Sequence, residues 1–364
     1  MVRSVETTQA AKARSSSPLT LGCKMGEEIR QQPDTYRRIL MEGRGSIVHV
    51  AKAIGRYQPR FVLLAARGSS DHAALYGKYL VETRLRLPAG LISPSTFTLY
   101  HSQPRLDEVL FIAVSQSGSS PDLIVAAEAA RGAGAMTVAI TNDSSSNLAG
   151  VAEHQLSMLS GPEESVAATK TCTAAMLVLL LMLESSTVRG WPDEAIDLPN
   201  RAASVLSDLE PAVGLMAEDL LDTHRMLVTS RGYNLSVARE SALKLTEAAL
   251  IPAFSYSTAD LMHGPVAMVD TGFPVIAIIP EGPAGKAMAP ALQTLIGRGA
   301  GIYTVGSDQG AASSRRHLDT GSIPDFLSPL LNLLPLQMLA REAGVRRGRD
   351  PDRPAGLAKV TYTI

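Results

Sequence analysis

An internal repeat with a spacing of 164 residues constrains the fold of this chain more than any other feature. Three pairs of segments share the spacing: Arg67-Gly68 with Arg231-Gly232 (231 − 67 = 164), Phe111–Gly118 with Val275–Gly282 (282 − 118 = 164), and Val138–Thr141 with Ile302–Val305 (302 − 138 = 164). Each pair falls where an apolar run ends. Three strand ends in one register predict a tandem duplication of one domain.

Within each copy, short apolar runs alternate with amphipathic helical segments. In the first copy the runs Phe61–Ala66, Val109–Val114 and Met136–Thr141 have the composition of buried parallel strands. The sequence therefore predicts an α/β protein with two tandem doubly wound parallel-sheet domains of the flavodoxin-like type and flanking helices. The expected divisions are a tail with lead-in helices over 1–44, a first domain over 45–190, a second domain over 210–345 and a C-terminal tail over 346–364.

Composition narrows the partners and the location of the protein. Its net charge of −1 spreads over 364 residues without a basic cluster, which argues against nucleic-acid or membrane partners. The apolar run Ala174–Leu183 is too short to span a bilayer and predicts a buried helix. Cys23 and Cys172 offer neither a disulfide framework nor a zinc pattern. Residues 1–18 lack the apolar segment of a signal peptide, so we expect a cytoplasmic protein whose residues 1–20 are partly disordered.

A hydroxyl-rich turn follows the expected strand at Val109–Val114. Ser115, Gln116, Ser117 and Ser120 lie in it, directly before a helix that begins at Pro121. A helix start leaves N–H groups unpaired and carries partial positive charge, which suits a phosphate. The turn has no lysine and no P-loop pattern, so a sugar monophosphate fits better than a nucleotide. The alternative is that these residues only turn and cap the chain.

The first copy carries a second turn of this kind, whereas the second copy differs. Ser69 and Ser70 follow Arg67-Gly68 at the expected start of a helix. At the place of the serine turn the second copy reads Ile279-Pro280-Glu281-Gly282, which lacks the hydroxyls. We therefore expect the first copy to bind phosphate and the second to contribute chemistry.

Charged residues stand on one face of an expected helix after Arg231-Gly232. Glu240, Lys244 and Glu247 occupy positions i, i+4 and i+7. Such a set is often a solvated surface pair. The functional interpretation rests on its position where an α/β sheet places its ligand, and on His263, a loop histidine followed by a Gly-Pro turn. A glutamate and a histidine near a phosphosugar supply the groups that open a ring and move a proton beside a carbonyl.

Spacing leaves two segments open. Thr169 and Lys170 precede the apolar helix and are either a cap and a surface residue or part of a sugar pocket. Residues 349–359 form a tail rich in proline and charge, of a kind that is usually disordered, and spacing alone would pass over Lys359.

Together these motifs resemble the sugar isomerase (SIS) domain family. Within that family they resemble tandem members, namely the isomerase half of glutamine:fructose-6-phosphate aminotransferase and the type II glucosamine-6-phosphate deaminases. The resemblance covers roughly residues 25–364 and rests on six motifs: Arg67-Gly68-Ser69-Ser70, Ser115-Gln116-Ser117-Gly118, Val166–Lys170, Glu240–Glu247, His263-Gly264-Pro265 and Leu357-Ala358-Lys359.

The resemblance implies a role for each candidate residue. Residues that would hold the 6-phosphate and nearby sugar hydroxyls are Ser70, Ser115, Gln116, Ser117 and Ser120, with Ala168 and Glu240 beside them in the sugar pocket. Glu247 would move a proton between C1 and C2, and Lys244 would support the charge on its helix. His263 would open the pyranose ring from the neighbouring subunit of a homodimer. Lys359 would close over the sugar, where aminotransferases can form an imine with the ketose. No metal or organic cofactor is implied.

Departures from the family pattern shape the expected function. Val2 follows Met1, where the aminotransferase has the nucleophilic cysteine of a glutaminase domain, so we expect no ammonia from glutamine. Ala168 replaces a frequent serine, and Met262 replaces a lysine before the histidine. The expected activity is conversion of glucosamine 6-phosphate to fructose 6-phosphate and ammonia. The alternatives are another phosphosugar aldose–ketose isomerase, an aminotransferase-type isomerase half, a fructosamine-6-phosphate deglycase and a non-enzymatic phosphosugar sensor.

Overall fold

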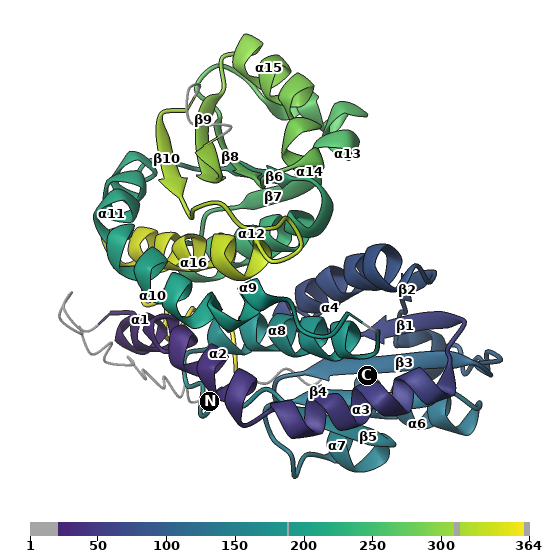
Figure 1. Cartoon of the computed structure of the whole chain (residues 1–364). Coiled ribbons are helices and arrows are strands. Elements are labelled where there is room, and N and C mark those ends of the chain that lie inside the picture. Colours follow the sequence, from purple (N-terminus) through teal and green to yellow (C-terminus); the bar gives the residue numbers. More distant parts are fainter. Residues whose placement is uncertain (1–20, 188, 309–313, 360–364) are drawn as a thin grey trace, which may run out of the picture.

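The computed structural model describes residues 21–187, 189–308 and 314–359, and it contains two parallel sheets of five strands each (Figure 1). Sheet A has the order β2-β1-β3-β4-β5, with bounds Ala89–Leu91, Phe61–Ala65, Val109–Ser115, Met136–Thr141 and His154–Ser157. Sheet B has the order β10-β9-β8-β6-β7, with bounds Arg316–Asp319, Gly301–Gly306, Pro274–Ile279, Met226–Ser230 and Ala253–Ser257. The predicted fold class is confirmed. The expected disorder of residues 1–20 lies outside the described residues.

The helices fall into three groups. Lead-in helices precede sheet A: α1 (Cys23–Arg30), α2 (Gln32–Met41) and α3 (Arg44–Tyr57). The first copy adds α4 (Ser69–Leu80), η2 (Val81–Leu85), α5 (Ser95–Thr98), α6 (Pro121–Gly132), α7 (Asn147–Val151) and α8 (Lys170–Ser185). The rest are α9 (Asp193–Ile196), α10 (Leu198–Asp208), α11 (Glu210–Asp219), η3 (Gly232–Asn234), α12 (Leu235–Ala249), α13 (Thr258–Met262), η4 (Pro265–Met268), α14 (Pro283–Lys286), α15 (Ala289–Gly297) and α16 (Pro329–Arg346).

The two copies share their topology. When β1–β5 are matched in chain order with β6–β10, the order of sheet A becomes β7-β6-β8-β9-β10. This is the order of sheet B read from its other edge. The turn glycines Gly68 and Gly118 and their counterparts Gly232 and Gly282 all have positive φ, a conformation that favours glycine.

The strand pairing corrects one of the predicted alignments by a residue. Phe111 pairs with Thr137 in sheet A, and Val275 pairs with Ile302 in sheet B. These pairs give spacings of 164 (275 − 111) and 165 (302 − 137). Ile302 is therefore the counterpart of Thr137, and the alignment of Ile302 with Val138 is wrong by one position.

One hydrophobic core joins the two copies. The predicted buried helix is confirmed as α8, in which every residue from Lys170 to Glu184 is buried, as expected for a helix that is apolar all round. The same cluster of side chains includes Val62 and Leu110 from sheet A and Met226 and Ile276 from sheet B. Because α8, α12 and α16 fill the space between the sheets (Figure 1), the copies are held in a fixed relation across this core.

Among the described residues, no helix is long and apolar enough to cross a membrane.

Candidate functional site

The serine turn is a tight structure at the carboxyl end of β3. The buried hydroxyl of Ser115 accepts a hydrogen bond from the N–H of Gly118 at 3.1 Å, and Ser117 Oγ accepts one from the N–H of Ser119. Ser120 is the N-cap of α6, but its side chain makes no capping hydrogen bond. Ser115 and Ser117 therefore brace the turn, while Ser120 leaves its hydroxyl at the open start of a helix, where an anion is favoured.

The turn after β1 lies against this one because β1 and β3 are adjacent. Arg67 joins the two turns by donating from Nε to Asp122 Oδ2 at 2.9 Å, and the other oxygen of Asp122 accepts from the N–H of Leu123. The ion pair neutralises a buried carboxylate that would otherwise repel a phosphate. The side chains of Ser70 and Gln116 make no hydrogen bond within the described residues, which leaves them available to a ligand.

The charged face of α12 is buried, so its interpretation as a surface pair is wrong. Glu240 and Lys244 each leave 1% of the side chain exposed, whereas Glu247 leaves 22%. Lys244 Nζ donates to Glu247 Oε2 and lies 3.6 Å from Glu240 Oε1. On the other side, His72 of α4 places Nδ1 2.7 Å from Glu240 Oε2. The four side chains form a continuous row that ends at the partly exposed Glu247.

The electrostatics of this row keep its central members charged. Burial alone would raise the pKa of Glu240, but Lys244 and then His72 hold it below its ordinary value. Burial likewise disfavours the charged form of Lys244, and Glu240 and Glu247 together raise its pKa well above the usual range. A buried lysine between two carboxylates thus stays protonated.

The packing of α4 against α12 places the end of α12, with Glu247, beyond the start of α4. The two helices run antiparallel: beyond the end of α4, Thr83 contacts Tyr233 before α12, and at the start of α4 His72 contacts Glu240. Seven residues of helix carry the chain about 10 Å beyond Glu240 to Glu247. This direction leads past the start of α4, where Ser70 lies, at the carboxyl edge of sheet A.

The start of α8 completes this region. Glu163, which is fully buried, accepts hydrogen bonds from the N–H groups of Thr169 and Thr171. Lys359 donates to Glu163 Oε2 at 2.9 Å and to the carbonyl oxygen of Ser165 at 2.6 Å. The C-terminal tail therefore reaches the loop that holds the half-buried Ala168.

The two residues that spacing left open at this loop have clear positions. Lys170 is buried and donates to Gln31 Oε1 and to the carbonyl oxygen of Pro162, so it is not a surface residue. Thr169 is the N-cap of α8, but its side chain makes no capping bond and its Oγ1 is buried without a partner.

His263 is not brought to this row within one chain. It is exposed and follows α13 at the carboxyl end of β7, whereas α12 runs back from β6 so that Glu247 lies near the amino end of β7. A five-residue strand spans roughly 15 Å. His263 therefore lies at the carboxyl ends of the strands of sheet B, and Glu247 lies at their amino ends.

Sequence reasoning missed three contacts in this region. His72, Asp122 and Glu163 were not among the candidate residues, yet His72 contacts Glu240, Glu163 contacts Lys359, and Asp122 contacts Arg67 of the first turn motif, each at 3 Å or less. The available signal for His72 was its place two residues after Ser70, inside the first turn of the same helix.

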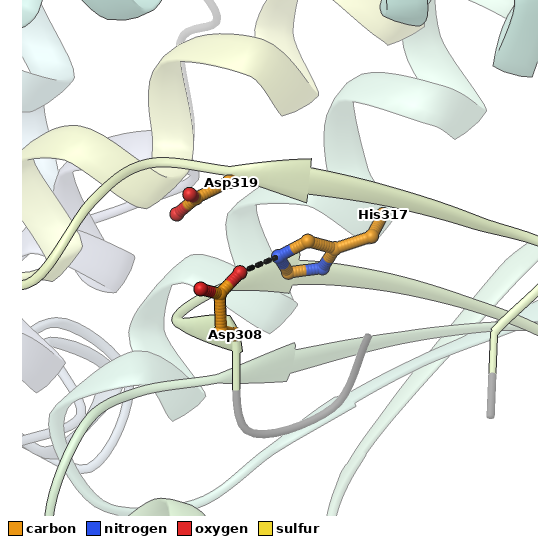
Figure 2. A group of neighbouring side chains, drawn as sticks. All are labelled: Asp308, His317 and Asp319. Atoms are coloured by element: carbon orange, nitrogen blue, oxygen red, sulfur yellow. Dashed lines mark ion pairs between the residues drawn. The ribbon is translucent and has the colours of Figure 1, made fainter. Parts of the chain in front are cut away.

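A separate cluster has the composition of a metal site. Asp308, His317 and Asp319 place one ligand atom each within 4.8 Å of one another, and Figure 2 shows the Asp308 carboxylate facing the His317 ring. His317 and Asp319 belong to β10 and Asp308 lies two residues after β9, on the side of sheet B away from β7. Both aspartates are exposed, and exposed carboxylates need no ion, so we assign no metal to them.

A cavity of about 620 Å³ lies elsewhere, between α1, α10, α11 and α16. Ile29, Leu206 and Met338 are among the residues that line it, and none of the candidate site residues does.

Comparison with known proteins places these features in a family. The model of the SIS domain matches residues 56–185 and again 219–346. A glutamine–fructose-6-phosphate aminotransferase [isomerizing] from Methanothermobacter thermautotrophicus is 34% identical over 340 residues, which cover 92% of this chain and 56% of the relative. The chain thus spans about half the length of the curated relatives it matches.

Solved structures share the whole fold. A provisionally named phosphosugar isomerase from Silicibacter pomeroyi DSS-3 is 32% identical with a TM-score of 0.82, covering 90% of this chain and 99% of that one. Glucosamine-6-phosphate deaminase from Thermotoga maritima is 20% identical with a TM-score of 0.72, covering 93% and 100%, and at that identity it shows the fold alone. With both copies matched by the family model, the chain belongs to the SIS domain family.

Proposed function

We propose that this protein is a phosphosugar enzyme that converts glucosamine 6-phosphate to fructose 6-phosphate and ammonia. The observation that carries the proposal is the row from His72 to Glu247, in which the buried Glu240 and Lys244 lead to the partly exposed Glu247. The antiparallel packing of α4 and α12 supports a position of Glu247 beyond the start of α4, where Ser70 lies. The names of relatives at 34% and 32% identity support a phosphosugar substrate.

The reaction assigns a task to each part of the site. Ser70, Gln116 and Ser120 bind the 6-phosphate at the starts of α4 and α6. In the ring-opened sugar, Glu247 removes the proton from C2 and returns it to C1, while the amino nitrogen gives up a proton and the C1 oxygen gains one. The amino aldehyde thereby becomes a ketose imine. Water then adds to the imine carbon and ammonia leaves. Lys244 stabilises the carboxylate form of Glu247, the form that accepts a proton.

The ring-opening group comes, in this proposal, from a second copy of the chain. His263 is exposed at the carboxyl ends of the strands of sheet B, whereas the Glu247 of the same chain lies at their amino ends. A homodimer that sets His263 of one protomer against the serine turns of its partner would complete the site. Sedimentation of the purified protein, together with mixing of His263→Ala and Glu247→Gln chains, tests this arrangement: restored activity in the mixture requires sharing.

Ammonia release from glucosamine 6-phosphate is the experiment that tests the function. We expect turnover by the wild-type protein, loss of at least about 100-fold in Glu247→Gln, and no loss in Glu128→Gln, a matched change at an exposed position of α6. Unchanged turnover in Glu247→Gln would contradict the assignment of the base.

Two further assays separate the alternatives. Ammonia from fructosamine 6-phosphate but not from glucosamine 6-phosphate would indicate a deglycase, and interconversion of ketose and aldose phosphates without ammonia would indicate an isomerase. A protein that fructose 6-phosphate stabilises against heat, but that turns over none of these compounds, would be a sensor.

A further inference from the structure

We propose that His72 is a positioning residue that sets the proton affinity of Glu247 through Glu240 and Lys244. The inference rests on the proposed function for its catalytic meaning, but its physical content concerns the four side chains alone. His72 belongs to the first copy and the other three residues to the second. The effect of His72 on Glu247 therefore acts across the contact between α4 and α12.

The geometry shows a competition for one ammonium group. Lys244 Nζ is hydrogen-bonded to Glu247 Oε2 but lies 3.6 Å from Glu240 Oε1, an oxygen that is buried without a hydrogen-bond partner. Glu240 tolerates this distance because His72 Nδ1 lies 2.7 Å from its other oxygen and the Ser69 hydroxyl adds a hydrogen bond. The contact of His72 with Glu240 therefore allows Lys244 to form its hydrogen bond with Glu247.

Removing the histidine reverses the competition. Glu240 would then be a fully buried carboxylate that keeps only the hydroxyl of Ser69 and the ammonium group of Lys244 as partners, and an undersatisfied buried charge is strongly unfavourable. Lys244 would turn from Glu247 toward Glu240. Glu247 would lose the partner that favours its ionised form, and its pKa would rise.

The other titratable groups around the row are few. On α4, Asp71 interacts with Arg239 of α12 as well as with His72, and on α8 the Cys172 thiol faces Glu240 and Lys244. Burial raises the pKa of Cys172 well above its ordinary value, so it stays a neutral thiol, which donates to the carbonyl oxygen of Ser69.

The remaining elements packed on α12 direct their ionisable groups elsewhere. On α16, Arg341 and Glu342 pair with each other, and Arg341 also donates to the carbonyl oxygen of Gly22. On β7, Tyr256 packs into the hydrophobic cluster of sheet B that contains Leu261. Apart from Asp71, Arg239 and Cys172, the ionisable groups that act on the row are therefore its own four members.

Three substitutions at position 72 test the proposal. Asparagine can place its amide N–H near the position of Nδ1, whereas glutamine places it farther along and alanine removes it. We expect His72→Ala and His72→Gln to raise the pKa of Glu247 by about one unit, and His72→Asn to leave it close to wild type. His154→Ala is the matched control, because His154 has a similar exposure and lies next to Glu153 on an edge strand of sheet A.

The readout does not depend on turnover. The pKa of Glu247 is followed by NMR in protein labelled with ¹³C at glutamate carboxyl groups, with its resonance assigned by its absence in Glu247→Gln. An unchanged titration of Glu247 in both His72→Ala and His72→Gln overturns the inference, as does an equal shift in His72→Asn. If alanine prevents folding, the comparison of asparagine with glutamine decides.

Activity then connects the inference to the reaction. The acid limb of the kcat/KM profile should move to higher pH by the same amount as the Glu247 titration. A shifted titration in a protein whose Glu247→Gln variant keeps full turnover would leave the positioning role intact and refute the base, so the two failures are distinguishable.

Discussion

The equivalent helices of the two copies, α4 and α12, pack against each other but differ in the side chains at matching positions. At the repeat spacing of 164, the charged residues of α12 correspond to residues of the first copy as follows: Glu240 to Tyr76, Lys244 to Leu80 and Glu247 to Thr83. Tyr76 and Leu80 are fully buried. The same buried face is therefore apolar in the first copy up to its last position and ionic in the second.

This difference indicates function in α12. Replacing a buried ion pair with well-packed apolar residues is often neutral or stabilising, so stability does not explain why the second copy keeps charges here. The first copy shows that the fold accepts apolar residues at these positions. The charges of α12 are thus best explained by what Glu247 does at the end of the row.

The turns after β3 and β8 differ in the opposite sense. In the first copy a serine turn leads into α6, a helix of 12 residues, whereas in the second Glu281 and Gly282 lead into α14, a helix of four. A carboxylate at a short helix repels an anion, and Glu281 instead accepts a hydrogen bond from Ser322. Each copy has kept one half of a site: anion binding in the first and the charged row in the second.

Lys244→Leu, which gives α12 the residue that α4 has, should have the largest effect. It leaves the buried Glu240 without its lysine, and removal of one partner from a buried pair costs about 3–5 kcal/mol of stability. Urea unfolding at pH 7 measures this cost. Lys78→Leu on α4 is the control, because its pair with Glu82 is about one-third exposed and contributes under about 1 kcal/mol. Equal losses in the two variants would contradict the distinction between the helices.

Gly118→Ala should destabilise the protein more than Gly282→Ala, because the turn at Gly118 is more tightly packed. Gly118 has a φ of 61°, and an added Cβ would lie 2.1 Å from Ser146 Oγ and 2.5 Å from Ser146 Cβ, whereas one at Gly282 would meet open space. Both changes carry backbone strain of about 1–3 kcal/mol, and only Gly118→Ala adds overpacking of a further 1–3 kcal/mol, roughly. Thermal unfolding of the two variants measures the difference, and a smaller loss at Gly118 would refute the tight packing of the serine turn.

The sequence predicted the central strands of both sheets and missed three edge strands. The apolar runs gave β1, β3 and β4 to within a residue or two, because both faces of β3 and β4 are buried and one face of β1 is buried while the other is partly buried. The missed strands are β5, β7 and β10, whose sequences His154–Ser157, Ala253–Ser257 and Arg316–Asp319 are short and largely polar. An edge strand with exposed side chains has little periodicity to detect.

In the candidate site, the sequence predicted relations between residues close together in the chain and missed contacts between residues far apart in it. Helical spacing placed Glu240, Lys244 and Glu247 on one face, because that relation is local. It could not show that His72, 168 residues away, contacts Glu240, since the packing of α4 on α12 sets that pair. The position of His263 stays a prediction, because one chain does not hold both halves of the expected site.

The starts of α8 and α16 offer a third comparison between the copies. Glu163 before α8 is paired with Lys359, whereas Asp325 before α16 has a buried Oδ1 without a hydrogen-bond partner. Burial raises the pKa of Asp325 to about 6. Its protonated form therefore favours the folded state: the stability is fully present below the unfolded pKa near 4 and is lost as pH rises through 6.

Asp325→Asn should remove this dependence on pH. After discounting for partial exposure, we expect the variant to gain on the order of 1–2 kcal/mol over wild type at pH 7 and nothing at pH 4. Urea unfolding at the two pH values measures the gain. A variant that is equally affected at both pH values would show that Asp325 is not protonated near pH 6.

Ser120→Ala gives the first copy the residue that the second has at this place, Ala284 (120 + 164 = 284), and should have the smallest effect on stability. Because the Ser120 side chain makes no capping bond, its loss should change the free energy of unfolding by under about 0.5 kcal/mol. Ser115→Ala should instead cost about 1–2 kcal/mol, since the buried N–H of Gly118 loses its acceptor. If the hydroxyl of Ser120 is kept for a ligand, Ser120→Ala should weaken fructose 6-phosphate binding about threefold to tenfold, for one lost hydrogen bond. Calorimetric titration measures the binding, and unchanged affinity in a stably folded variant would show that the first copy keeps this serine for neither purpose.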